Sequence, residues 1–215
     1  MYLVLFLTCS NLSYGQINAA VIKNKKLTDS ITYGYLNKLF ITGDFNGKGK
    51  SDTIFQNIIS KSRNIPIDSF PNNDWDLTCD FFNKMNSDII LTVSDKKSDT
   101  LHLGFGKGLY CLINIGDNNH DGKDEIACVI NYCDESNLNS CKIYTLCNKK
   151  WIELFEFGIH EDAFMDNNRN TNHIFFNIPC FLEKINGHWL YSDYYKQEYT
   201  KDGLKKHDLK IKGCH

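Results

Sequence analysis

Short apolar runs separated by turn-forming residues follow one another through most of the chain. Two of the turns stand out, because Asn148-Lys149-Lys150 and Asn186-Gly187 each lie between apolar runs, and Asn-Gly is a strong hairpin signal. The pattern predicts ten strands, at 39–42, 53–59, 88–93, 100–103, 109–115, 125–132, 142–147, 151–157, 181–185 and 188–192. We therefore expect a mainly β protein.

One stretch, from about 74 to 85, has helical spacing instead. Its apolar residues fall on one face of a helix: Trp75, Cys79, Phe82 and Met85. Asn73 or Asp74 can cap the first turn. We interpret this face as part of the core rather than as a functional site.

The loop between strands 109–115 and 125–132 is rich in side-chain oxygens: Asp117-Asn118-Asn119-His120-Asp121-Gly122-Lys123-Asp124-Glu125. Calcium-wrapping loops supply oxygens from positions 1, 3 and 5, a backbone carbonyl at 7 and a later carboxylate, with glycine at position 6. Those places are taken in order by Asp117, Asn119, Asp121, the Lys123 carbonyl and Glu125, with Gly122 at the turn. The loop is therefore expected to bind calcium between two strands. An ordinary polar turn is the alternative, because tight turns use the same residue types.

A weaker copy of this loop lies upstream at 44–52, where Asp44, Asn46 and Asp52 match the first, third and last ligand positions. Lys48 stands at the fifth position, where a carboxylate is needed. An ammonium group beside calcium in a low-dielectric pocket is strongly repelled. We predict a metal-free loop in which Lys48 bridges Asp44 and Asp52, or else a plain turn.

These two loops and their flanking strands resemble the FG-GAP or VCBS repeat, the integrin-type calcium module that begins a propeller blade. Phe105-Gly106 before Gly116-Asp117, and Tyr33-Gly34 before Gly43-Asp44, fit the front of that pattern. The rear departs from it, since Val129-Ile130-Asn131-Tyr132 stands where the family often has Gly-Ala-Pro. The resemblance implies a calcium loop between blade-like strands.

A closed propeller does not fit the length of the chain. If one repeat unit is as long as the distance from Asp44 to Asp117, a chain of 215 residues holds fewer than three units. Closed propellers use about four to eight blades. The predicted fold is mainly β, with two or three blade-like antiparallel sheets in one domain and one short helix. A β-sandwich is the alternative.

The first ten residues, Met1-Tyr2-Leu3-Val4-Leu5-Phe6-Leu7-Thr8-Cys9-Ser10, are largely apolar but too few to span a bilayer. They predict a secretory signal over 1–15, cleaved near Gly15, although it lacks the usual positively charged start. Residues 16–215 then form a single β-rich domain that is secreted or periplasmic. A lipid anchor on Cys9 and a buried N-terminal strand are the alternatives.

Eight of the nine cysteines follow Cys9, and an even number in an oxidising compartment predicts disulfides. None is spaced as Cys-x-x-Cys, which argues against common zinc and thioredoxin-like sites. A hairpin turning at 134–140 brings Cys133 opposite Cys141, and the calcium-loop hairpin brings Cys111 almost opposite Cys128. These pairs are candidate disulfides, with buried free thiols as the alternative.

Charge and motifs limit the function. With 24 Lys and Arg against 26 Asp and Glu, neither nucleic acid nor an anionic membrane is indicated as a partner. No Gly-x-Ser-x-Gly, Walker or His-Glu-x-x-His motif occurs. We predict a non-enzymatic, monomeric, secreted calcium-binding structural or ligand-binding protein, whose partner is a protein or a glycan. The alternative is a small metal-assisted hydrolase that uses His160, Glu161 or the loop carboxylates.

Overall fold

The computed structural model describes residues 31–95, 97–165 and 175–214. The predicted signal over 1–15, including Cys9, lies outside the described residues. No helix in the described ranges is both long and apolar enough to cross a membrane.

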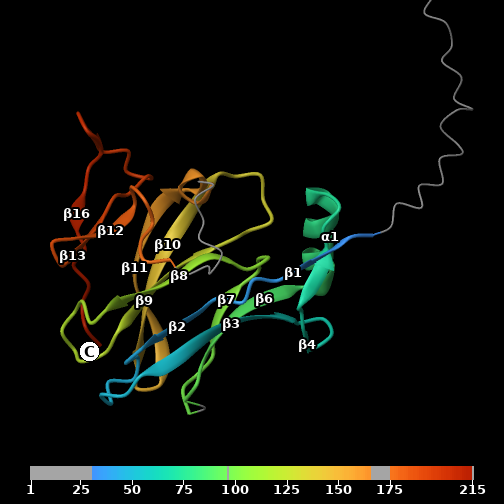
Figure 1. The fold of residues 1–215 in the computed structure, drawn as a ribbon, viewed down its shortest axis with the longest axis horizontal. Helices are drawn as coiled ribbons and strands as arrows, with labels where there is room; N and C mark the ends of the chain where they lie inside the picture. The colour runs from blue at the N-terminus through green and yellow to red at the C-terminus, as the bar shows by residue number, and fades with distance from the viewer. Residues whose placement is uncertain (1–30, 96, 166–174, 215) are drawn as a thin grey trace, which may run out of the picture. The chain divides into compact units, whose positions relative to one another are not determined.

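The described chain is mainly β, and every named pair of strands is antiparallel (Figure 1). Its single α-helix, α1, spans Trp75–Met85, and a short 3-10 helix spans Glu161–Phe164. The strands are β1 (Tyr33–Tyr35), β2 (Phe40–Gly43), β3 (Asp52–Ser60), β4 (Ile65–Pro66), β5 (Ser69–Pro71), β6 (Ser87–Val93), β7 (Leu101–Gly104), β8 (Leu109–Gly116), β9 (Glu125–Ile130), β10 (Leu138–Cys147), β11 (Lys150–His160), β12 (Leu182–Ile185), β13 (His188–Tyr191), β14 (Tyr199–Thr200), β15 (Gly203–Leu204) and β16 (His207–Asp208). Each of the ten predicted strands overlaps one of these.

Five open sheets are formed. The largest has the order β2-β3-β6-β7, with β4 paired to β3, and the next has the order β11-β10-β9-β8. A third contains β12-β13-β16, and the pairs β1-β5 and β14-β15 complete the set. The predicted class, a mainly β chain with several antiparallel sheets and one helix, is therefore confirmed, although five sheets form where two or three were expected.

Strand β9 shows how the sheets are layered, because all six of its residues are buried. Side chains of a strand alternate between its two faces. Ile126, Cys128 and Ile130 pack in one core with β3 and β6 of the largest sheet. Ala127 and Val129 pack in a second core with residues of β12 and β13. The four-stranded sheet is thus covered on both faces, a sandwich-like arrangement.

Helix α1 begins and ends where local chemistry requires. The side chain of Asp74 accepts a hydrogen bond of 2.7 Å from the Leu77 backbone N–H and so caps the start. Asn86 ends the helix in the left-handed region, with φ of 48°. Phe82 is fully buried on the inner face. The predicted cap and core face are both correct, except that Trp75 is 42% exposed.

Both predicted hairpin turns are present as two-residue connections. Asn148 and Lys149 join β10 to β11 with φ of 49° and 72°. Asn186 and Gly187 join β12 to β13 with φ of 51° and 85°. Two consecutive positive φ values match the right-handed twist of paired strands, and Asn and Gly tolerate them best.

Neither predicted disulfide is formed, and all four cysteines involved are free. Cys141 pairs in register with Val129 rather than with Cys133, because β10 begins at Leu138 and runs beside β9. Cys111 also pairs with Val129, so it lies on the opposite face of the sheet from Cys128. The disulfide present joins Cys147 to Cys214 across 67 residues of sequence.

Candidate metal centre

The predicted calcium loop, 117–125, connects β8 to β9, whose register closes at Gly116 and Glu125. Gly122 has a φ of 87°, which a side chain at this position of the turn would strain. The hairpin therefore holds the loop between two buried strands.

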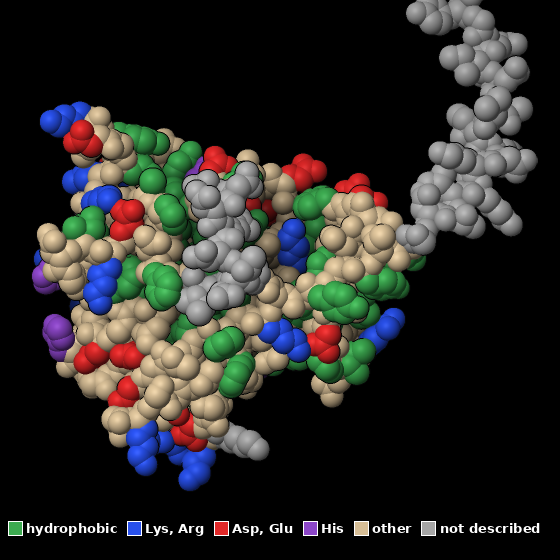
Figure 2. All heavy atoms as spheres, viewed as in Figure 1, with side chains coloured by type: hydrophobic (Ala, Val, Ile, Leu, Met, Phe, Trp, Pro, Cys, Tyr) green, Lys and Arg blue, Asp and Glu red, His purple; other side chains and the backbone are tan. Residues whose placement is uncertain are grey.

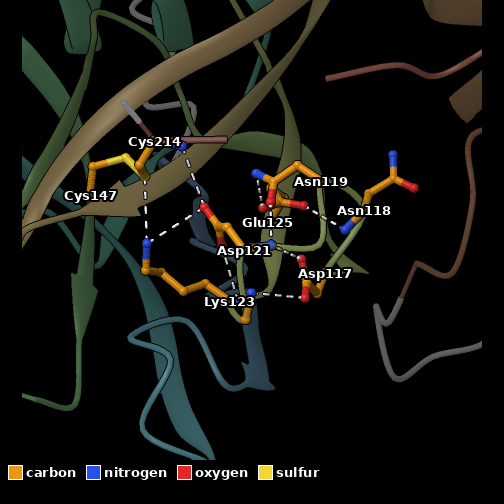
Figure 3. Close-up of polar contacts among 9 residues, drawn as sticks. Asp117, Asn118, Asn119, Asp121, Lys123, Glu125, Cys147 and Cys214 are labelled. Carbon is orange, nitrogen blue, oxygen red and sulfur yellow. Dashed lines mark hydrogen bonds and ion pairs between the residues drawn. A yellow bond between two sulfur atoms is a disulfide. The ribbon is translucent and has the colours of Figure 1, made fainter. Parts of the chain in front are cut away.

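Hydrogen bonds from backbone N–H groups fold the loop around its own carboxylates (Figure 3). Asp117 accepts from the N–H groups of Asp121 at 3.0 Å and Gly122 at 2.9 Å. The Asn119 side-chain oxygen accepts from the Asp121 N–H at 2.9 Å. Asp121 accepts from the Lys123 N–H at 3.1 Å. These bonds draw the side-chain oxygens of positions 1, 3 and 5 to one side of the turn.

Glu125 is fully buried at the base of the loop. Its two oxygens accept from the Asn119 side-chain amide and the Asn118 N–H, each at 2.8 Å. Burial raises the pKa of Glu125 from 4.5 to about 7, and the negative charges of Asp121 and Asp117 add to the rise, while the bonds from Asn118 and Asn119 oppose it. This group of carboxylates therefore disfavours a third negative charge.

Three carboxylates meet in this loop. Oxygens of Asp117, Asp121 and Glu125 all lie within 4.8 Å of one another, and no other group of three potential ligands was found in the described ranges. Calcium binds oxygens at 2.3–2.6 Å, so two ligands of one ion lie no more than about 5 Å apart. The arrangement fits a hard divalent cation, with Asn119 beside it. The ammonium of Lys123 lies 3.5 Å from the Asp121 carboxylate.

The C-terminal segment lies against the same loop. The Cys214 N–H is 3.5 Å from a carboxylate oxygen of Asp121, and the Lys123 ammonium is 3.6 Å from the Cys214 sulfur. The disulfide to Cys147 at the end of β10 holds this segment in place. Sequence reasoning missed this pairing, because it sought partners that are close along the chain.

The upstream loop, 44–52, repeats four of the hydrogen bonds of the loop 117–125. Asp44 accepts from the N–H groups of Lys48 at 2.9 Å and Gly49 at 2.6 Å, as Asp117 does from its own fifth and sixth positions. The Asn46 oxygen accepts from the Lys48 N–H at 3.1 Å, and the Asn46 amide donates to Asp52. The two loops therefore share one backbone design.

Lys48 does not bridge Asp44 and Asp52 as predicted. Its ammonium forms an ion pair of 2.8 Å with Asp95, which follows β6, and this bond raises the pKa of Lys48. The Lys48 side chain is 58% exposed. In this position the ammonium stays hydrated, whereas a place inside the loop would strip away its water.

Asp124, at position 8, joins the two loops. Its N–H donates to the Asp44 carbonyl at 3.0 Å, and its carboxylate accepts from the Asp44 N–H at 3.0 Å. The same carboxylate oxygen accepts from the Asn114 amide at 2.9 Å. Sequence alone gave Asp124 no role, since its partners lie on another part of the chain.

Two residues of the alternative hydrolase site, His160 and Glu161, interact with different partners. Glu161 is 9% exposed and accepts from the Tyr110 hydroxyl at 2.7 Å and the Asn139 amide at 3.0 Å. His160 instead pairs with Asp162 at 3.2 Å. Glu161 is thus a buried structural acceptor.

Comparison with known proteins adds no relative. No family model matches the chain, and searches of the curated proteins and of the solved structures found no match. The site is therefore interpreted from its own geometry.

Proposed function

We propose that this protein is an exported calcium-binding β-protein, in which one ion in the loop 117–125 stabilises the scaffold. The convergence of Asp117, Asp121 and Glu125 within 4.8 Å supports the proposal most strongly. Three like charges so close repel one another, and a divalent cation reverses that repulsion. The resemblance to FG-GAP and VCBS loops points the same way, and export agrees with the signal-like start.

A structural role for the ion fits the segments that meet at the loop. The strands β8 and β9 enter it, the upstream loop is tied to it through Asp124, and the C-terminal segment touches Asp121. An ion there would hold together parts of the chain that are distant in sequence. Selective binding to the folded state then raises stability with calcium concentration.

A metal-assisted hydrolase remains the second candidate because of one cavity. About 540 Å³ of space borders the loop at Asp117, Asn118 and His120. Catalytic metals keep a coordination position open toward such a space, whereas structural metals are enclosed by protein. Glu125 lies on the buried side of the loop, which favours the structural role.

Calorimetric titration of the mature chain with calcium tests the proposal. We expect one site with a dissociation constant of about 10⁻⁴ to 10⁻³ M, as in extracellular modules. Asp121→Asn should abolish binding, because it removes a charged ligand at constant size. Asp76→Asn on the exposed surface of α1 is the matched control and should bind as the natural chain does.

Two results would contradict the proposal: no binding at millimolar calcium, or equal binding by Asp121→Asn and the natural chain. Hydrolysis of ester or phosphate substrates that stops in chelator would instead favour the second candidate.

A further inference from the structure

A second cavity lies at the other end of the β8–β9 hairpin from the calcium loop. About 520 Å³ in volume, it is bordered by the start of β8 at Leu109 and Tyr110 and by Asn131, which directly follows β9. Its opposite wall comes from β1, β5 and the first turn of α1. This volume falls within the range of small-molecule sites.

Aromatic side chains form much of the cavity wall: Tyr35, Phe70, Trp75, Tyr110 and Phe175. Tyr35 is 83% exposed and Trp75 42% exposed, so both rings are open to a ligand. One face of Tyr110 is already covered by the parallel ring of Phe164, 4.8 Å away. Large exposed rings beside a cavity offer flat apolar surfaces for the C–H faces of a ligand.

Amide side chains supply most of the polar lining: Asn37, Asn72, Asn73 and Asn131. An amide both donates and accepts hydrogen bonds, as a hydroxyl group does. Charge is sparse and of both signs, with one lysine, Lys107, and one acid, Asp74. The Asp74 carboxylate already caps α1. The face shown in Figure 2 likewise mixes acidic and basic side chains.

One lining residue of this cavity, and one residue bonded to its wall, have a buried side-chain acceptor without a hydrogen-bond partner within the described ranges. One is the side-chain oxygen of Asn131, whose backbone is held by Lys107 and Gly108. The second belongs to Gln56, which is 2% exposed, does not itself line the cavity, and donates to the carbonyl of the lining residue Asn37 at 3.4 Å. Buried acceptors are nearly always satisfied, so an unpaired one at a cavity indicates a missing donor.

We infer that this cavity binds a neutral saccharide of about two sugar units. A sugar ring presents an apolar C–H face to aromatic rings, and its hydroxyl groups donate to and accept from amides. An anionic ligand would need a cluster of Arg or Lys, which this lining does not offer. The inference concerns a site separate from the calcium loop and does not depend on metal binding.

An array of immobilised neutral oligosaccharides is the first probe, with charged oligosaccharides and short peptides on the same surface. We expect binding to at least one neutral saccharide, with a dissociation constant of about 10⁻⁵ to 10⁻³ M by titration with the free sugar. Tyr35→Ala and Trp75→Ala should each weaken it about tenfold, because each removes one stacking surface. Tyr199→Ala removes another exposed ring, one that does not border the cavity, and should leave binding unchanged.

Thermal melting of each variant confirms that it is folded. The measurements are made both in calcium and in chelator, so that a failed calcium site does not hide saccharide binding. Binding only to charged sugars or to peptides, no binding at all, or equal weakening by Tyr199→Ala would overturn the inference.

Discussion

Glu125 should make the stability of the calcium-free protein fall as pH rises. Its pKa is raised from 4.5 to about 7 in the folded state, chiefly by burial. Between these values the folded protein holds the proton and the unfolded chain releases it, so unfolding is favoured by each rise in pH. The stability that protonation provides is complete below pH 4.5 and is lost as pH passes 7.

The size of the effect follows from the shift. One pKa unit corresponds to about 1.4 kcal/mol, so the free energy of unfolding should drop by at most about 3 kcal/mol across this range. Calcium requires the ionised carboxylate, so it competes with the proton. Below pH 7, calcium affinity should fall by up to about tenfold for each pH unit.

Urea unfolding in chelator from pH 4.5 to 8 measures the first effect, and calorimetric titration with calcium over the same range measures the second. Glu125→Gln is the matched variant, because it keeps the size of the side chain and removes its titration. Other titrating groups cancel in the difference between the two proteins. If both proteins show the same pH slope in chelator, or if calcium affinity is constant from pH 5 to 8, the reasoning about Glu125 is wrong.

Three further predictions concern the cysteines and the upstream loop. Replacing both Cys147 and Cys214 by Ser should lower the free energy of unfolding by about 2–4 kcal/mol, as measured by urea unfolding. The same change should weaken calcium binding, as measured by calorimetry. Unchanged calcium affinity would mean that the C-terminal segment does not contribute to the site. Lys48→Asp should create a second calcium site, since the rest of that loop already has the same hydrogen bonds; a single site by titration would refute this. Burial raises the pKa of Cys133 to about 12, and the Cys79 thiol adds to the rise, so little thiolate is present at neutral pH and oxidation by glutathione disulfide should be slow. Rapid formation of a Cys79–Cys133 bond, seen by peptide mapping, would refute this.

Local features of this protein were predictable from its sequence. The ten strands, the capped helix α1 and the two hairpin turns each depend on residues within a few positions of one another. The shape of the loop 117–125 is local in the same way, because the hydrogen bonds within the loop join residues no more than seven positions apart. The periodicity of apolar residues and the preferences of turn residues act over these short distances, so both can be recognised in the sequence.

The long-range pairings were decided by the tertiary structure. Asp124 meets Asp44, Lys48 meets Asp95, and Cys147 meets Cys214, in each case across a large part of the chain. No local pattern selects such partners, since they depend on which sheet faces pack together and on strand register. Cys133 and Cys141 show the consequence. The sequence suggested a hairpin that pairs them, but in the structure β10 pairs with β9 and places Cys141 opposite Val129. That register buries both faces of the four-stranded sheet.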